Sequence, residues 1–198
     1  MPQQPILALF DFDGTLTRRD TLLDFIRFYR GNVSLYRGLI QLAPTLLAFK
    51  LGFIPNWIAK ERTLTHFFGG ESAARFAERG TDYAKQRLPQ IIRPSALRKL
   101  QELKQQQATV YVVSASAEGW IQPWCESLGL HLIATRLEVQ HEKITGKIAG
   151  KNCYGPEKAQ RIRELLSLAH YEIYAYGDSR GDREMLELAH YPHYRFFK

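Results

Sequence analysis

Short apolar runs alternate with amphipathic stretches through most of this chain. The runs at 6–10, 109–113 and 172–176 have the length and the flanking turn residues that are typical of buried strands. An antiparallel hairpin is expected at 130–139 and 143–149, a last edge strand at 190–198, and helices at 95–107, 119–128, 157–169 and 183–189. This order predicts an α/β fold that is Rossmann-like, with a mainly parallel sheet and helices on both faces.

Residues 20–85 follow a different pattern and form a mostly helical insertion after the first strand. A first helix is expected to start at Asp20, an N-cap residue type, and to break at Gly31-Asn32. The next stretch, 38–59, holds one charged residue, Lys50. It also contains two prolines, which together with the charge argue against a membrane span.

The apolar stretch 38–59 therefore has two interpretations. We expect an apolar helical pair that packs on the rest of the protein. The alternative is a helix that lies in a membrane interface, favoured by basic residues on both sides of the stretch. These residues are Arg30, Arg37, Lys60 and Arg62.

Composition and charge narrow the class of protein. The 198 residues are 45% hydrophobic and 24% charged, which suits one globular domain with or without a sizeable insertion. The net charge of +7 suits phosphorylated ligands, anionic membrane surfaces or nucleic acid. Lys and Arg are scattered, however, and no basic run is interleaved with aromatic residues, so no nucleic-acid partner is expected.

The cysteines and the start of the sequence indicate the cellular compartment of the protein. Cys125 and Cys153 lie far apart and lack metal-site spacing, so we expect reduced thiols. Asp11 and Asp13 interrupt the start of the chain, where a signal peptide would need an apolar core. A cytoplasmic protein is predicted, with peripheral contact at the inner membrane surface as the alternative for the apolar stretch. His190 and His193 have no metal-site spacing with the acidic motifs and are expected to be structural.

Polar side chains follow three of the predicted strands at the edge where ligands bind in an open parallel sheet. Asp11 and Asp13 end the first strand, Ser114-Ala115-Ser116 ends the second, and a Gly-Asp-rich segment at 177–182 ends the third. Lys158 stands at an expected helix start. Each element alone has a plainer explanation, such as a solvated turn, a helix cap or a surface charge. Four of them at one edge favour a site.

These residue types suit phosphoryl transfer. Asp11 can attack phosphorus and form an aspartyl-phosphate, while Asp13 protonates the leaving oxygen and later activates water. Oxygen ligands from Asp11, Asp178 and a backbone carbonyl suit Mg²⁺. Ser114 and Lys158 offer a hydroxyl and a positive charge to phosphate oxygens.

The chain resembles the haloacid dehalogenase-like phosphohydrolases over nearly its whole length. Its DxDx[TV] motif is Asp11, Asp13 and Thr15, its second motif is Ser114, its third is Lys158, and its fourth is Gly177, Asp178 and Asp182. The resemblance implies Asp11 as nucleophile, Asp13 as acid/base and Asp178 as a Mg²⁺ ligand. It also implies that Asp13 coordinates the metal through its main-chain carbonyl, and that Asp182 is a ligand or orients the ligands.

The helical insertion resembles the cap of the phosphoserine-phosphatase-like branch. The resemblance implies a core at 1–19 and 86–198 and a cap at 20–85 that closes over the site. Asp20 stands where phosphoserine phosphatase has a glutamate, and Ser-Ala-Ser replaces the usual Ser-Gly-Gly. These departures argue against phosphoserine as the substrate. The apolar cap resembles that of relatives which act on phospholipid head groups.

A Mg²⁺-dependent phosphomonoesterase is therefore expected, acting on a phosphorylated small molecule or a phospholipid head group. Besides the nucleophile, the residues expected to bind the substrate are Asp20, Arg62, Ser114, Ala115 and Lys158. Phosphoserine phosphatase or phosphotransferase activity on the same chemistry stays open. A receiver-type signalling module also uses clustered aspartates, but it lacks the large insertion and the second aspartate of the first motif. A catalytically silent binding protein is disfavoured because every required side chain is present.

Overall fold

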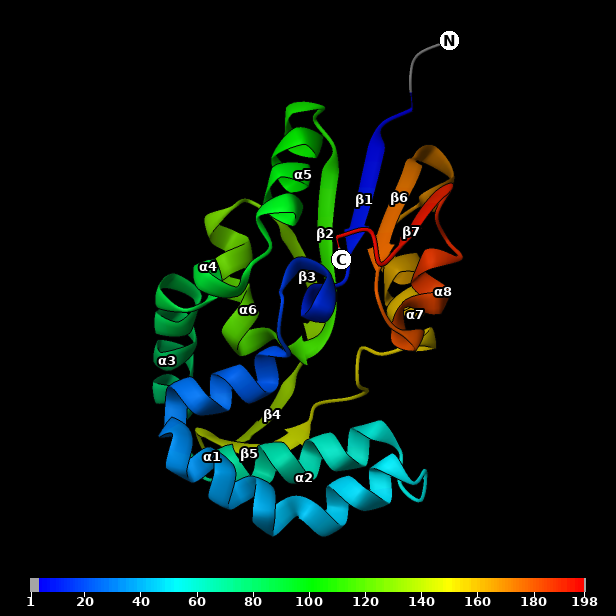
Figure 1. Ribbon diagram of the computed structural model, residues 1–198. Helices are drawn as coiled ribbons and strands as arrows, with labels where there is room; N and C mark the ends of the chain where they lie inside the picture. The colour runs from blue at the N-terminus through cyan, green and yellow to red at the C-terminus, as the bar shows by residue number, and fades with distance from the viewer. Residues whose placement is uncertain (1–3, 198) are drawn as a thin grey trace.

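A sheet of five parallel strands organises the molecule, which is described by a computed structural model over residues 4–197 (Figure 1). The strands are β1 Ile6–Phe10, β2 Thr109–Ala117, β3 His131–Thr135, β6 Glu172–Gly177 and β7 Tyr191–Tyr194. Their order is β3-β2-β1-β6-β7, so the chain turns to opposite sides of β1 and creates a switch point there. The predicted α/β fold with a parallel sheet is confirmed.

Helices cover both faces of this sheet, as predicted. Alternate residues of β1 explain why: Ala8 and Phe10 belong to one buried cluster, whereas Leu7 and Leu9 belong to another on the opposite face. The helices beside the sheet are α5 Pro94–Gln105, α6 Glu118–Ser127, α7 Pro156–Leu165 and α8 Arg183–Leu186. Two further helices, α3 Ala73–Gln86 and α4 Leu88–Ile91, pack on one another, and α3 also packs on α6. The first cluster includes residues of α5 and α6, and the second includes residues of α7 and α8.

The remaining elements lie beyond the carboxyl ends of the strands (Figure 1). They are α1 Thr21–Lys50, α2 Asn56–Phe68 and a hairpin of β4 Leu137–Gln140 and β5 Lys143–Ile148. The break predicted at Gly31 is a kink, where φ is 82°, and the helix resumes and runs to Lys50. The apolar stretch 38–59 therefore spans the end of α1, a turn at 51–55 and the start of α2.

Two predicted elements are corrected. The single strand expected at 130–139 is divided at Arg136, because β3 joins the parallel sheet while β4 leaves it to pair with β5. The helix expected at 157–169 ends at Leu165, and a separate short turn follows at Leu168–His170.

The hairpin packs on the helical insertion, although it lies in the range predicted for the core. The backbone of Ile144 exchanges hydrogen bonds with Gly70 and Glu71, at the end of α2. At Gly146 a side chain would come within 2.3 Å of the Thr65 backbone, so only glycine permits this approach. The division at residues 19, 20, 85 and 86 stays a prediction, and residues 1–3 and 198 at its ends lie outside the described residues.

The remaining expectations concern cysteines, histidines and membrane spans. Cys125 and Cys153 are buried free thiols. His190 accepts a hydrogen bond from the Ile173 backbone, and His193 of the edge strand β7 stacks on Tyr176, so both contribute to structure. Among residues 4–197, no helix combines the length and apolar character needed to cross a bilayer.

Candidate active site

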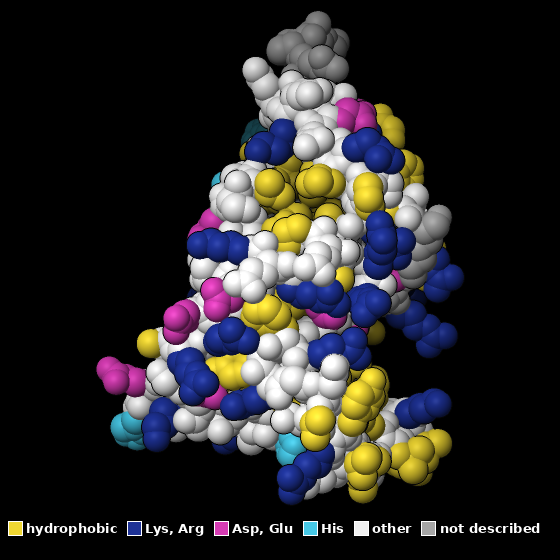
Figure 2. Space-filling view, turned by 60° about the vertical axis from the view of Figure 1, so that its left-hand side comes forward, with side chains coloured by type: hydrophobic (Ala, Val, Ile, Leu, Met, Phe, Trp, Pro, Cys, Tyr) yellow, Lys and Arg dark blue, Asp and Glu magenta, His cyan; other side chains and the backbone are white. Residues whose placement is uncertain are grey.

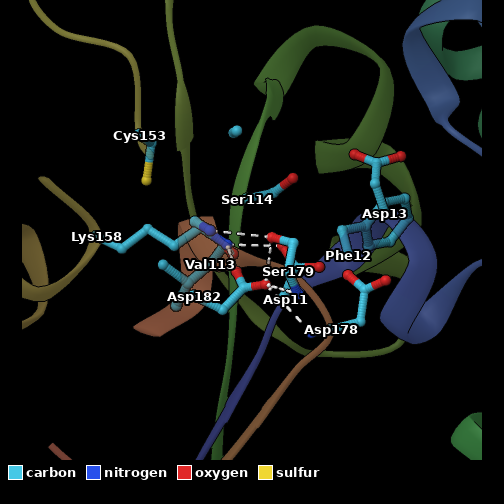
Figure 3. A network of polar contacts seen from close by, with 12 residues as sticks. Asp11, Phe12, Asp13, Val113, Ser114, Cys153, Lys158, Asp178, Ser179 and Asp182 are labelled. Atoms are coloured by element: carbon cyan, nitrogen blue, oxygen red, sulfur yellow. Dashed lines mark hydrogen bonds and ion pairs between the residues drawn. The ribbon is translucent and has the colours of Figure 1, made fainter. Parts of the chain in front are cut away.

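Lys158 joins three parts of the sheet edge at the centre of the site (Figure 3). Its fully buried ammonium group donates hydrogen bonds to Asp11 Oδ1 at 2.6 Å, Asp182 Oδ1 at 2.7 Å and the Val113 carbonyl oxygen at 2.7 Å. Asp11 follows β1, Val113 lies in β2 and Asp182 follows β6, while Lys158 itself lies in the first turn of α7. One cation thereby positions residues from elements that are distant in the sequence.

Burial and charge act in opposite directions on the pKa values of Lys158 and its partners. Burial lowers the pKa of Lys158, but Asp11 and Asp182 outweigh this effect and hold it above the ordinary value, so it stays a cation. Burial raises the pKa of Asp11 to about 7, although Lys158 opposes the shift. A second cation beside Asp11 would lower that pKa and keep the carboxylate ionised, as a nucleophile requires.

Asp182 is held from both sides. Its second oxygen accepts hydrogen bonds from the backbone amides of Asp178 and Ser179, and from the Ser179 hydroxyl at 2.8 Å. Burial raises its pKa, but Lys158 and Ser179 outweigh that effect and the net shift is downward. Gly177 is needed here, since a Cβ atom would lie 2.5 Å from Cβ of Asp182. With both oxygens engaged, Asp182 orients Lys158 and the 177–179 segment.

Asp13 lies in a separate hydrogen-bond network, at the junction with α1. Its carboxylate accepts a hydrogen bond from the Thr21 backbone amide at 2.6 Å and one from the Ser116 hydroxyl at 2.5 Å. Trp120 donates to the Thr21 hydroxyl and so fixes that side of the network. Burial, reinforced by the charge of Asp20, raises the pKa of Asp13 to about 6. That value suits a group that must both donate and accept a proton near neutral pH.

A cluster of three carboxylates could hold a metal ion. One oxygen each of Asp11, Asp178 and Asp182 lies within 4.8 Å of the others. Gly14, at φ 81°, lets the backbone approach Asp178, because a Cβ atom would lie 2.4 Å from Asp178 Oδ2. Carboxylate oxygens are the donors that Mg²⁺ prefers. The chemistry of this donor set therefore fits a Mg²⁺ ion.

A cavity of about 610 Å³ lies between this cluster and the helical insertion. The predicted site residues that line it are Asp11, Asp13, Asp20, Ala115, Lys158, Asp178 and Asp182. Ser114 is fully buried beside this group, where its hydroxyl accepts a hydrogen bond from the Ser116 amide at 3.0 Å. Arg62 is not among the lining residues: its exposed guanidinium group lies 3.3 Å from the Thr45 hydroxyl.

Lys60 and its contacts were missed as site residues by the sequence prediction. Its ammonium group, on α2, donates to the Ala115 carbonyl oxygen and to Asn152 Oδ1, the second at 2.9 Å. It therefore links the helical insertion to two segments of the sheet region. Burial lowers its pKa to about 8. The only sequence signal is a lone lysine at the end of an apolar stretch, which supports the membrane-interface alternative for that stretch and does not indicate a site.

Ser116, Thr21 and Asn152 were also missed. Ser116 and Thr21 bind the Asp13 carboxylate, and Asn152 also accepts a hydrogen bond from Thr135 at 3.0 Å. Ser116 lies near the end of β2, Thr21 begins α1 and Asn152 lies in a loop. Their contacts with the site depend on how these elements pack, which their residue types do not indicate.

Comparisons with known proteins agree with this geometry. The family profile of haloacid dehalogenase-like hydrolases matches residues 8–187. Protein CicA of Caulobacter vibrioides is 32% identical over 200 residues, which cover 100% of this chain and 89% of that protein. A probable phosphatase of Mycobacterium tuberculosis is 32% identical over 192 residues, which cover 91% of this chain and 65% of that protein.

Solved structures share the fold. A Bordetella pertussis protein of unknown function superposes with a TM-score of 0.78 at 24% identity, covering 93% of this chain and 87% of that one. A phospho-aspartyl intermediate analogue of phosphoserine phosphatase gives 0.67 at 21% identity, covering 94% and 84%. The match of motif, site geometry and family profile leads to one conclusion: this chain belongs to the haloacid dehalogenase-like hydrolases, a family of enzymes, and has the fold of their phosphoserine-phosphatase-like branch.

Proposed function

We propose that this hydrolase is a Mg²⁺-dependent phosphatase that cleaves a phosphomonoester through an aspartyl-phosphate on Asp11. The observation that carries the proposal is the contact between Asp11 and the buried cation of Lys158 at the base of the cavity. Asp13 faces the same cavity with a raised pKa, and the three-carboxylate cluster fits the metal. A nucleophile, an acid and a charge-neutralising group are the parts that phosphoryl transfer requires.

The first half-reaction forms the covalent intermediate. A carboxylate oxygen of Asp11 attacks phosphorus, the ester P–O bond breaks, and Asp13 gives its proton to the leaving oxygen. The Ser114 hydroxyl offers a donor to the phosphoryl oxygens. Lys158 offers its positive charge, because its three protons already bind Asp11, Asp182 and the Val113 carbonyl oxygen. Mg²⁺, when bound by Asp11 and Asp178, supplies positive charge that offsets the charge of the phosphoryl group.

The second half-reaction releases phosphate. Asp13, now ionised, takes a proton from water, whose oxygen attacks phosphorus, and the bond between phosphorus and Asp11 breaks. Inorganic phosphate leaves and Asp11 is regenerated. If an alcohol enters in place of water, the same steps transfer the phosphoryl group, so phosphotransfer stays an open outcome of the chemistry.

The cavity wall favours a substrate with an apolar portion. Leu39, Leu46 and Phe49 of α1 line the cavity opposite the carboxylates. Such a wall suits the organic part of a lipid phosphate or another apolar phosphorylated molecule better than the small polar body of phosphoserine. Screening phosphorylated metabolites and lysophospholipid phosphates, with phosphoserine included, tests this substrate class. A cytoplasmic location and the lack of a nucleic-acid partner stay predictions.

The nucleophile is tested with a soluble aryl phosphate and Mg²⁺. Asp11→Asn is expected to lower kcat by about 10³-fold or more, since the covalent route is removed. Asp82→Asn is the matched control, because Asp82 lies on α3 outside the cavity. Retained hydrolysis in Asp11→Asn, with an unchanged circular dichroism spectrum, would show that the assignment is wrong.

The acid/base residue is tested separately by Asp13→Ala. With an activated leaving group, which needs no protonation, this variant is expected to release one equivalent of product rapidly and then turn over slowly. Phosphate bound covalently to the acid-quenched protein would accompany the burst. A variant that lacks both the burst and the bound phosphate contradicts the two-step scheme.

A further inference from the structure

The second half of α1 is apolar on two opposite sides. Its inner side holds Leu35, Gly38 and Leu42, all buried. Its outer side holds Val33, Tyr36, Ile40 and Leu47, and Leu51 follows directly after the last residue of the helix. The outer positions are separated by three, four, seven and four residues, so they form one stripe along the helix.

This outer stripe is exposed. Val33 is 83% and Ile40 is 75% exposed, and the stripe continues past the end of the helix to Phe53, at 79%, and Trp57, at 49%. Figure 2 shows hydrophobic side chains gathered beside basic ones at the lower right, where α1 ends and α2 begins. A helix of a soluble protein normally presents polar side chains on its outer face, so this exposed stripe indicates a binding surface.

The charge around the stripe has one sign. Between Asp24 and Glu61 the sequence contains no acidic residue, whereas it contains five basic residues. These are Arg27, Arg30, Arg37, Lys50 and Lys60. Arg37 and Lys50 are exposed and belong to the same half of α1 as the stripe.

We propose that this face of the cap, formed by the outer stripe of α1 with Phe53 and Trp57, docks on an anionic lipid surface. Apolar side chains would enter the acyl boundary while Arg37 and Lys50 contact anionic head groups. A second copy of the chain fits poorly, because it would bring the same positive charges together. Two residues of this face, Tyr36 and Trp57, have the side chains that favour the interface between lipid and water.

The proposed docking leaves the helix in the plane of the membrane. This orientation agrees with the finding that none of the helices within 4–197 can span a bilayer. The inner side of the same helix segment lines the catalytic cavity with Leu39 and Leu46. Docking would therefore place the cavity wall directly behind the lipid-facing surface.

Vesicle flotation with the full-length protein tests the proposal without any catalytic step, so the result is independent of the proposed phosphatase activity. The wild-type protein is expected to float with phosphatidylglycerol-containing vesicles and to stay unbound with pure phosphatidylcholine. Arg37→Glu/Lys50→Glu is expected to weaken binding by about 25-fold or more, since each basic residue near an anionic surface contributes a factor of about five. Binding should also fall at high salt.

The apolar contribution is tested by Ile40→Ser/Phe53→Ser. Neither residue lines the cavity, so hydrolysis of a soluble aryl phosphate should match that of the wild type and report an intact fold. Binding to anionic vesicles is expected to fall at least tenfold. Leu165→Ser, an exposed apolar residue on α7 far from the stripe in sequence, is the control and should bind normally.

Tryptophan fluorescence supplies an independent readout. Trp120 and Trp124 are buried, whereas Trp57 is half exposed, so vesicle docking should shift the emission of Trp57 to shorter wavelength. The shift should vanish in Trp57→Phe. The proposal is overturned if the wild type ignores anionic vesicles at low salt, or if Ile40→Ser/Phe53→Ser binds as tightly as the wild type. It is also overturned if sedimentation shows a dimer that this double variant dissociates.

Discussion

The Ser116 hydroxyl lies 2.5 Å from the carboxylate of Asp13, a residue 103 positions earlier in the chain. Ser116 occupies the third position of the Ser-Ala-Ser segment, where the family resemblance led us to expect glycine. The serine gives Asp13 a partner from the end of β2, while Thr21 supplies the partner from α1. The departure from the expected motif therefore acts directly on the proposed acid/base residue.

The first prediction concerns the pH profile. The Ser116 hydrogen bond lowers the pKa of Asp13, whereas the charge of Asp20 raises it. Ser116→Ala should therefore raise that pKa above about 6, and Asp20→Asn should lower it. Asp13 must be protonated to act as an acid, so the alkaline limb of kcat/KM should move to higher pH in Ser116→Ala and to lower pH in Asp20→Asn.

Both variants can be checked for effects other than the intended change in the pKa of Asp13. Asparagine is as good a helix N-cap as aspartate, so Asp20→Asn should preserve the start of α1, where Asp20 accepts a hydrogen bond from the Leu23 amide. Ser116→Thr, which keeps a hydroxyl, should retain the wild-type profile. Shifts of both variants in the same direction would contradict the assignment of Asp13.

The second prediction concerns Lys60. Its charge lies in the cavity wall, so Lys60→Gln should raise KM for a dianionic substrate by about tenfold or more, the value of a charged hydrogen bond, with a smaller effect on kcat. The pKa of Lys60 is lowered to about 8, so the group is charged below that pH and neutral above it. The wild-type KM should therefore rise as pH increases through 8, whereas the KM of Lys60→Gln should lack this rise.

Lys50→Gln provides the control for Lys60. Lys50 is exposed at the end of α1 and does not line the cavity. The KM of Lys50→Gln for a soluble substrate should therefore equal that of the wild type. Equal KM values for Lys60→Gln and the wild type at pH 7 would exclude a substrate contact by Lys60.

The third prediction concerns the metal. A methyl group at Gly14 would collide with Asp178 Oδ2, so Gly14→Ala should displace that carboxylate and raise the Mg²⁺ concentration for half-maximal activity at least tenfold. Gly52→Ala is a matched control, because Gly52 has the same φ of 81° and its added methyl group would meet nothing within 4 Å. Activity should disappear in EDTA and return with Mg²⁺. Identical Mg²⁺ dependence in the two variants would count against Asp178 as a ligand.

The fourth prediction concerns stability. The buried Asp24 carboxylate accepts hydrogen bonds from Arg87 at two nitrogens, both at 2.8 Å, and from the Tyr83 hydroxyl. Asp24→Ala removes a charged partner from both groups and should lower the free energy of unfolding by about 3 kcal/mol. Asp82→Ala, which removes a more exposed ion pair with Arg79 at 3.4 Å, should cost less than about 1 kcal/mol.

The lowered pKa of Asp24 determines at which pH this stabilisation is lost. Burial raises the pKa of Asp24, but Arg87 and Tyr83 outweigh it, and the net shift is below the ordinary 3.8. The stabilisation is therefore complete above that ordinary pKa and is lost as pH falls through the lower value of the folded state. Urea unfolding of the wild type and Asp24→Ala should show a smaller difference in the free energy of unfolding near pH 3 than at pH 7. If that difference were the same at both pH values, the ion pair between Asp24 and Arg87 could not be the source of the stabilisation.

Much of the site was predictable because its residues stand at strand ends. Asp11, Asp178 and Asp182 follow β1 and β6, and parallel strands bring their carboxyl ends to one edge. The prediction failed where a strand left its sheet, as at Arg136, because the apolar pattern continues across the break. It also failed for Arg62 and Lys60, two cations two residues apart on α2 that point to different surroundings.

By itself, the sequence determined the parallel sheet, an interruption of the helix at Gly31 and the identity of the acidic residues, since these depend on local periodicity, glycine and motif spacing. Only the tertiary structure decided that Ser116 binds Asp13 and that Lys60 joins the insertion to the sheet. The reason is physical: strand periodicity is a local property, whereas a hydrogen bond across about a hundred residues depends on how separately formed elements pack. The same packing turned one side of α1 toward the cavity and left its other apolar side exposed.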